Sequence, residues 1–447
     1  MTELASTAPM EKALCLFTKC SWRSLQLLCN DYACAHGKKL PKAHASLLKC
    51  VSIPPYADSD TRTELNILAK ANPDAACALA LHKASLTLAL KNATCNNLRN
   101  ANSHAYESIK ALISATTKLG FPLSPDFADT MLSQSAWLVN ALSSQSELKS
   151  LINASKIHSR LYFILGMHRS GTSALTGMLA QSGFAAPKDP MPATERNPKG
   201  YWESLRVFNL NEQFLSQLNS HWSSHISLPK GWAYSGKARE WRSALAESFA
   251  YAYQGGANPL IKDPRFSILI AGLEPWFEST LAQFIFLIPI RHPVEVANSL
   301  CQAESISASQ CIRLWIKSVY EAELATRGRL RLFIRYEDLI ENPLTVLSQI
   351  NQLTECQATS DKKRSPSIGD KIAESNLANS AAFIEPLLRH QQPQISYEIY
   401  PATDTASLEK LAAYAAKIYD SFADINTIKD ISSRLDELRS DDYFLMH

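Results

Sequence analysis

The sequence predicts an α/β protein, in which a doubly wound parallel sheet flanked by helices follows an all-α N-terminal region and precedes a helical tail. Short apolar runs appear only after about residue 157, and each is followed by polar residues and a helix-like stretch. Buried strands that alternate with helices are typical of a parallel sheet covered on both faces. The runs are residues 161–165 (LYFIL), 259–261 (PLI), 283–290 (QFIFLIPI) and 331–334 (RLFI).

The first 156 residues have a different character. They are rich in Ala, Leu, Ser and Asn, and prolines separate helix-length segments such as residues 84–98 and 127–144. Proline ends helices because it lacks an N–H group and clashes with the preceding turn. We therefore predict a helical domain over residues 1–156, whose role no motif indicates.

The end of the chain also reads as helical. Residues 407–422 (SLEKLAAYAAKIYDSF) carry apolar side chains at helical spacing. We predict that residues 401–447 form a helical extension, and that this extension packs on an α/β domain spanning residues 157–400.

Composition excludes several classes of protein. An apolar content of 46% and a charged content of 19% indicate a globular soluble chain. A net charge of +3 argues against a broad nucleic-acid surface. No window approaches the roughly 18 apolar residues of a membrane-spanning helix, and the N-terminus does not resemble a signal peptide. We expect a cytoplasmic protein.

The ten cysteines do not suggest a metal site. No CxxC pair occurs in the chain, so a zinc site is not predicted. Most cysteines are flanked by Ala and Leu, as Cys77 is within AACALAL. We read them as reduced thiols in the protein core.

A glycine-rich loop follows the first predicted strand. Gly166 and Gly171 are separated by four residues and followed by Thr172 and Ser173, which is the frame of a phosphate-binding loop. The lysine expected after the second glycine is replaced by Thr172, and the nearest cation is Arg169 within the loop. The glycines permit tight turns, and a helix starting near Thr172 directs its N–H groups and dipole at an anion.

The side chains of this loop favour a donor that reacts without a metal. Ser170, Thr172 and Ser173 provide hydroxyl donors, and Arg169 provides a planar set of N–H donors. A phosphosulfate suits such a loop, because its leaving group is a phosphate oxygen and hydrogen-bond donors stabilise the migrating charge.

A second anion site is expected after the strongest strand. Arg291 follows residues 283–290 directly, at the strand end where ligands of open α/β sheets bind. Pro293 suits the first turn of a helix, and Ser299 lies about two turns further along. Arg291 and Ser299 are therefore predicted to face one anion.

Together these motifs resemble the sulfotransferase family, whose donor is 3′-phosphoadenylyl sulfate (PAPS). Residues 169–173 (RSGTS) match the family's loop for the 5′-phosphosulfate, and the form GMHRSGTSAL looks most like its bacterial branch. The RxP motif with a serine eight residues after the arginine resembles the family's 3′-phosphate motif. Weaker similarities are residues 197–203 (NPKGYWE), 261–265 (IKDPR) and 335–343 (RYEDLIENP).

The resemblance covers roughly residues 160–390 and implies a P-loop-like α/β domain. It departs from the animal cytosolic members, whose RKG segment closes on the nucleotide, because residues 362–365 here read KKRS. The implied donor-binding residues are Gly166, His168, Arg169, Ser170, Gly171, Thr172, Ser173, Arg291 and Ser299.

The resemblance also suggests catalytic residues. Arg169 and Thr172 would serve the donor phosphate, and Lys262 or Arg265 would touch the migrating group or the acceptor. Glu203 is the first choice as general base, because carbohydrate-modifying members use a glutamate and partial burial would raise its pKa. His221 and His225 are the second choices, since other members use histidine.

Three functions stay open at this point. The first is a PAPS-dependent sulfotransferase that needs no metal and modifies a hydroxyl or amine, for example on a carbohydrate. The second is a P-loop kinase or hydrolase, which would need ATP and magnesium. The third is a non-catalytic member whose helical N-terminal domain binds a protein partner.

Overall fold

The structure is a computed structural model, and it describes most of the chain between residues 58 and 440. The described residues are Leu47, Leu148, Leu151 and residues 58–94, 98–119, 123–135, 138–139, 142, 160–194, 197, 199–277, 282–358, 382–384, 405–423 and 428–440. Contacts divide the chain into two compact units. One comprises Met1–Ser150, Ala233–Ser243 and Leu273–Leu281, and the other comprises Leu151–Trp232, Ala244–Gly272 and Ala282–His447.

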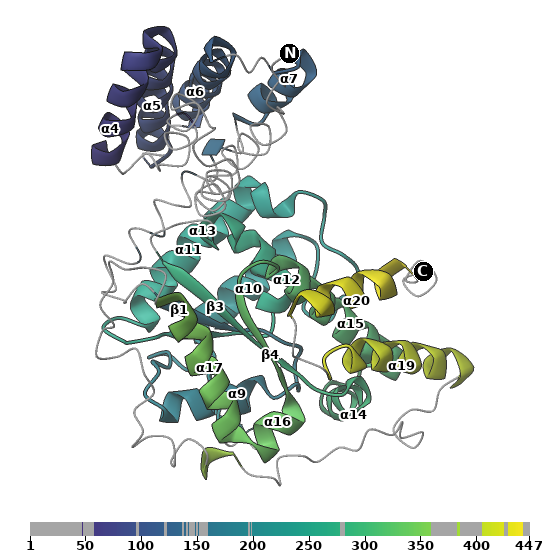
Figure 1. Cartoon of the computed structure of the whole chain (residues 1–447). Helices are drawn as coiled ribbons and strands as arrows, with labels where there is room; N and C mark the ends of the chain where they lie inside the picture. The colour runs from purple at the N-terminus through teal and green to yellow at the C-terminus, as the bar shows by residue number, and fades with distance from the viewer. Residues whose placement is uncertain are drawn as a thin grey trace. The chain divides into compact units, whose positions relative to one another are not determined.

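The described part of the N-terminal region is helical, as predicted. Its helices are α4 (Asp58–Ala71), α5 (Pro73–Thr94), α6 (Leu98–Lys118) and α7 (Pro125–Ser133) (Figure 1). Pro73 and Pro125 each occupy the first turn of their helix, where the N–H group that proline lacks would have no helical partner. Helices α5 and α6 pack along each other, and between them the buried His82 Nδ1 lies 3.0 Å from Ser108 Oγ. Burial lowers the pKa of His82 to about 3.

One prediction for this region was wrong. Cys77 was expected in the core, but it is exposed on α5, whereas its neighbours Ala76 and Ala78 are buried. A helix turns about 100° per residue, so one residue of an apolar run can face away from the core. Cys301 and Cys311, in contrast, are buried free thiols.

The second unit contains a four-stranded parallel sheet. Its strands are β1 (Arg160–Ile164), β2 (Leu260–Lys262), β3 (Gln283–Ile290) and β4 (Leu330–Arg335), in the order β2-β1-β3-β4. All three pairings are parallel, with Tyr162 opposite Leu260 on one side and Ile285 on the other. Each of the four predicted apolar runs thus forms a strand, within one or two residues at its ends.

Helices cover both faces of this sheet, which confirms the doubly wound architecture. Tyr162 and Ile164 point to one face and belong to a core shared with α9 (Thr172–Gln181) and α17 (Pro343–Ala358). Phe163 points to the other face, where its ring lies 5.6 Å from that of Phe266. Alternating residues of a strand face opposite sides, so near-continuous apolar runs are what a sheet covered on both faces requires.

The remaining helices connect the strands. They are α10 (Leu205–Gln217), α11 (Gly236–Ala252), α12 (Phe266–Leu269), α13 (Glu274–Phe277), α14 (Pro293–Glu304), α15 (Ala308–Ala325) and α16 (Tyr336–Glu341), with short 3₁₀ helices at Trp232–Tyr234 and Ile270–Leu273. Because parallel strands place their carboxyl ends at one edge, the residues after β1, β2, β3 and β4 meet there.

The C-terminal tail is helical, as predicted. Helix α19 (Thr405–Asp420) packs against α14 and α15, and α20 (Ile428–Ser440) follows it (Figure 1). The basic residues 362–365 lie outside the described part of the chain. Among the helices that the structure describes, none has both the length and the hydropathy needed to cross a bilayer.

Candidate active site

The turn after β1, residues 166–173, is here named the glycine loop. Gly166 has a φ of 123°, and a Cβ on it would lie 2.9 Å from the carbonyl oxygen of Pro289. Gly171, with a φ of 91°, forms the N-cap of α9, and a Cβ there would lie 2.5 Å from the ring of Tyr336. Both glycines are thus required by backbone conformation and by close approach of a neighbour.

The glycine loop is hydrogen-bonded to α12, and its Arg169 lies close to residues that follow β3. The N–H of Gly166 donates to Ser267 Oγ at 2.8 Å. Arg169 takes the left-handed conformation, with a φ of 69°, and its Nε donates to Ser299 Oγ at 2.8 Å. Its carbonyl oxygen accepts from Arg291 Nη1 at 3.2 Å. The loop and the end of β3 therefore face the same space.

The guanidinium of Arg291 is held by three contacts. Its Nε donates to Glu295 Oε2 at 2.9 Å, Nη1 reaches the glycine loop, and the plane lies over the Tyr336 ring at 4.4 Å. The buried Nη2 has no hydrogen-bond partner among the residues that the structure describes. An unsatisfied buried donor is costly, so this atom marks a place where an anion would fit.

His168 contributes a second buried nitrogen to this region. Its ring packs against Trp222 with centroids 4.7 Å apart, and within the described part of the chain its buried Nε2 has no hydrogen-bond partner. Burial lowers the pKa of His168 well below its ordinary value, and the positive charges of Arg265, Lys262 and Arg169 add to this effect.

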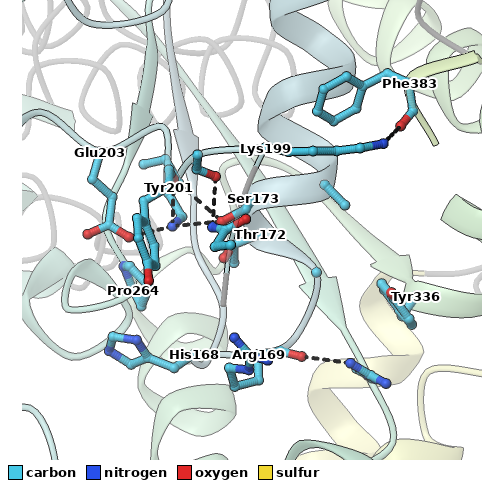
Figure 2. A pocket seen from close by; sticks show the side chains of 16 residues that line it. His168, Arg169, Thr172, Ser173, Lys199, Tyr201, Glu203, Pro264, Tyr336 and Phe383 are labelled. Atoms are coloured by element: carbon cyan, nitrogen blue, oxygen red, sulfur yellow. Dashed lines mark hydrogen bonds and ion pairs between the residues drawn. The ribbon is translucent and has the colours of Figure 1, made fainter. Parts of the chain in front are cut away.

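A cavity of about 330 Å³ opens beside the glycine loop. Figure 2 shows Glu203 and Tyr336 at opposite sides of the view, with Thr172 and Ser173 between them. The lining residues are His168, Arg169, Gly171, Thr172, Ser173, Ala174, Asn197, Lys199, Gly200, Tyr201, Glu203, Lys262, Pro264, Arg291, Tyr336 and Phe383.

Most of the predicted site residues line this pocket, and four do not. Gly166 and Ser170 support the loop from behind, since Ser170 is buried and its N–H donates to the carbonyl of Met167 at 3.2 Å. Ser299 reaches the pocket only through Arg169. His221 is exposed and its Nδ1 lies 2.8 Å from Ser223 Oγ, so the structure does not bring it to the pocket.

The opposite side of the pocket carries a group of paired charges, here named the Glu203 cluster: Glu203, Lys262, Asp263 and Arg265. Lys262 Nζ lies 2.5 Å from Glu203 Oε1, and Arg265 Nη1 lies 2.9 Å from Asp263 Oδ1. The Glu203 side chain is only 5% exposed. Burial raises the pKa of Glu203, although Lys262 acts in the opposite direction.

Lys262 connects the Glu203 cluster to the glycine loop. The lysine ends β2, and its Nζ donates to the carbonyl of Tyr201 at 3.0 Å and to Ser173 Oγ at 3.3 Å. Arg265 was considered together with Lys262 from the sequence, but it pairs with Asp263 and with Glu212 and is not among the lining residues.

Local structure fixes Glu203 at the edge of the pocket. Trp202 has a φ of 62°, which a non-glycine residue rarely adopts. Ser204 caps α10 by accepting the N–H of Val207 at 3.3 Å, as serine does at many helix starts. Glu203 is thus the last residue before a capped helix, and its backbone is held from both sides.

Sequence reasoning did not assign several of the residues that line the pocket, among them Tyr336, Lys199 and Phe383. Tyr336 stands within the RYEDLIENP segment, and its ring lies against both Gly171 and Arg291. Lys199 donates to the carbonyl of Phe383 at 2.8 Å. Phe383 packs where Gly177 of α9 has no side chain, since a Cβ there would lie 2.3 Å from the ring. Lys199 stands within the NPKGYWE segment, but no local signal points to Phe383.

Within the described residues, no group of three or more His, Cys, Asp or Glu side chains is arranged to hold a metal ion. The chemistry available at the pocket is that of arginine, lysine and hydroxyl donors on one side and a buried carboxylate on the other.

A family model and several solved structures are similar to this chain. The model of the sulfotransferase family matches residues 162–360. Among solved structures, the sulfotransferase domain from the Synechococcus PCC 7002 olefin synthase is 20% identical, with 57% of this chain and 94% of that chain covered and a TM-score of 0.31. Sulfotransferase STF9 from Mycobacterium avium is 16% identical, with 71% and 91% covered and a TM-score of 0.34.

A search of curated proteins returned no match. The assignment therefore rests on the family model, which spans the glycine loop, the Glu203 cluster and the arginine after β3. Residues 162–360 of this chain belong to the sulfotransferase family.

Proposed function

We propose that the protein transfers a sulfuryl group from PAPS to a hydroxyl or amine acceptor. The observation that carries this proposal is the meeting of Arg169 and Arg291, from the ends of two different strands, at one pocket. A nucleotide with phosphates on both its 3′ and 5′ positions needs two such groups of donors. ATP has no 3′-phosphate and would leave the second group without a partner.

The residues of the pocket fit this donor. The buried Nη2 of Arg291 has no partner among the described residues and suits a 3′-phosphate. The N–H groups at the start of α9, with Thr172 and Ser173, suit the 5′-phosphosulfate. Gly171 forms the N-cap of α9 with a φ of 91°, so the first N–H groups of that helix are available to an anion beside Thr172.

The catalytic roles follow from the two sides of the pocket. When bound, PAPS supplies a sulfuryl group whose bond to a phosphate oxygen breaks as the acceptor oxygen or nitrogen bonds to sulfur. Glu203 takes the proton of the acceptor. Lys262 holds Glu203 Oε1 and also reaches Ser173, so it keeps the base close to the glycine loop. Arg169 and Thr172 stabilise the charge on the leaving phosphate.

A carbohydrate is our proposed acceptor class, because the resemblance favours a glutamate base and Tyr201 and Trp202 flank this one. We propose that the donor-binding set is Gly166, His168, Arg169, Ser170, Gly171, Thr172, Ser173, Arg291 and Ser299. The division into a helical domain of residues 1–156, an α/β domain of residues 157–400 and an extension of residues 401–447 stays a prediction, as do a partner for the first domain and a cytoplasmic location.

Titration calorimetry tests the donor. We expect adenosine 3′,5′-bisphosphate to bind without metal and considerably more tightly than ATP with magnesium. The reverse preference would support a kinase or hydrolase. Transfer from sulfur-labelled PAPS to a panel of sugars, alcohols and amines then tests the activity. A chain that binds the bisphosphate tightly and transfers nothing to any acceptor would be a non-catalytic member.

A further inference from the structure

The tail helix α19 lies outside residues 162–360, which the family model matches, yet it contacts residues that are next to Arg291 and Tyr336 in the chain. Helix α19 packs on α14, the helix that follows Arg291. Near its end, Tyr419 is 4% exposed. The hydroxyl of a buried tyrosine usually forms a hydrogen bond with a specific partner, and the hydroxyl of Tyr419 has two such partners.

The hydroxyl of Tyr419 holds the residues on both sides of Tyr336. It donates to Glu337 Oε2 at 2.6 Å and accepts from Arg335 Nη2 at 2.9 Å. Arg335 ends β4 and Glu337 is the second residue of α16. The backbone turn that carries Tyr336 is therefore tied to α19 through both of its neighbours.

The ring of Tyr419 holds the residue next to Arg291. It packs edge to face against His292, with centroids 5.2 Å apart and planes at 67°. His292 in turn caps α14, since its side chain accepts the N–H of Val294 at 3.3 Å. Arg291 and Tyr336 form a stacked pair. The side chain of Tyr419 thus contacts residues that are next to each of them in the chain.

This stacked pair decides where the spare donor of Arg291 points. The guanidinium lies 4.4 Å above the Tyr336 ring, so a shift of the ring would rotate or displace its Nη2. Hydrogen bonds weaken steeply as their angle and distance depart from the ideal. A small displacement would therefore weaken the bond from Arg291 Nη2 to an anion more than the bonds made by the N–H and hydroxyl groups of the glycine loop.

We propose that Tyr419 is a positioning residue for Arg291, through which the C-terminal helix sets the preference of the pocket for a nucleotide that carries a 3′-phosphate. This inference rests on the proposed function. It gives the tail a role in substrate selection.

The test compares two nucleotides in the full-length chain. Adenosine 3′,5′-bisphosphate and adenosine 5′-monophosphate are titrated into the wild type and Tyr419→Phe, which keeps the ring and removes the hydroxyl. We expect the affinity for the bisphosphate to fall about tenfold, the factor that corresponds to about 1.4 kcal/mol. Affinity for the monophosphate should stay within about twofold, because its phosphate binds the N–H and hydroxyl groups of the glycine loop and does not use Arg291 Nη2.

Tyr414→Phe is the matched control. Tyr414 lies on the same helix and is also buried, and its hydroxyl bonds to that of Tyr320 at 2.9 Å and to the carbonyl of Leu438 at 3.1 Å. Neither Tyr320 nor Leu438 is next to Arg291 or Tyr336 in the chain, so the variant should lose similar thermal stability and keep the wild-type ratio of the two affinities. A change of ratio in Tyr414→Phe equal to that in Tyr419→Phe would mean general loosening and would overturn the proposal.

A second variant guards against misfolding of the first. Glu337→Ala removes the acceptor of the same hydrogen bond from the other side, and it should change the ratio in the same direction. If the wild type prefers the bisphosphate and both variants keep that preference, the role of Tyr419 is refuted while the proposed function stands. If the wild type binds both nucleotides equally, the proposed function and this inference both fail.

Discussion

The two sides of the pocket handle their charges in opposite ways. At the glycine loop and Arg291, the buried atoms Arg291 Nη2 and His168 Nε2 have no hydrogen-bond partner within the described structure. In the Glu203 cluster, each charged group faces an opposite charge, as with Lys262 and Glu203 at 2.5 Å. An unsatisfied buried donor costs ~1–3 kcal/mol, so the first side gains by binding an anion and the second is satisfied in its absence.

We expect this difference to separate the residues that bind the donor from the residues that act in the reaction. In the proposed function the glycine loop and Arg291 bind the two anionic groups of the donor, and loss of Arg291 should appear mainly in affinity. The Glu203 cluster holds its groups in place before any ligand arrives, and changes there should appear mainly in turnover. The predictions below test this separation, from the largest expected effect to the smallest.

Glu203→Gln should give the largest effect. It removes the proposed base and keeps the size of the side chain, so we expect kcat to fall by about a hundredfold or more. Affinity for adenosine 3′,5′-bisphosphate, measured by calorimetry, should stay within about twofold. Glu212→Gln is the control, because Glu212 also pairs with Arg265 but does not line the pocket. Wild-type turnover in Glu203→Gln would remove Glu203 from the mechanism.

Arg291→Met should give the reverse result. It removes the stacked guanidinium and its spare donor, so affinity for the bisphosphate should fall about a hundredfold, as expected for ~3 kcal/mol of lost charge-assisted hydrogen bonds. The kcat at saturating PAPS should change far less. Arg206→Met is the matched control. Arg206 also stacks on a tyrosine ring, that of Tyr251 at 3.8 Å, but it does not line the pocket. Equal losses in both variants would contradict an anion site at Arg291.

The pH dependence of turnover should report Glu203. Only its carboxylate accepts a proton, so kcat at saturating donor should fall as pH drops through its pKa, by about tenfold per pH unit. Burial raises this pKa above its ordinary value of 4.5, so the loss begins at a higher pH than for an exposed glutamate. Turnover could instead stay constant between about pH 5 and 8 and also not fall in more acidic buffer. That result would mean that another group is the base.

His221→Ala should give the smallest effect. The side chain is exposed and bonded to Ser223, and surface substitutions of this kind usually change stability by less than about 0.5 kcal/mol. We expect kcat and donor affinity within about twofold of the wild type in the same assays. A large loss of kcat would restore histidine as the base and would break the contrast between the two sides of the pocket.

Much of the fold could be predicted because its signals are local. The apolar run at residues 283–290 has the bounds of β3, and helix α9 begins at Thr172, where the glycine loop ends. Gly166, Gly171 and Arg291 were found for the same reason, since each depends on its own backbone conformation or on its position at a strand end. The exposure of Cys77 was missed because an apolar run does not show which residue of a helix faces outward.

The sequence by itself determined the chemical groups of this protein: a glycine loop with an arginine, a second arginine after a strand, and a glutamate beside two aromatic residues. Only the tertiary structure decided which groups meet. Arg169 reaches Ser299 and Lys262 reaches Glu203 across long separations in the chain, and Tyr419 reaches the neighbours of Tyr336 from the tail. The physical reason is that strand order and helix packing bring distant residues together, and these depend on burying the whole core rather than on any short segment.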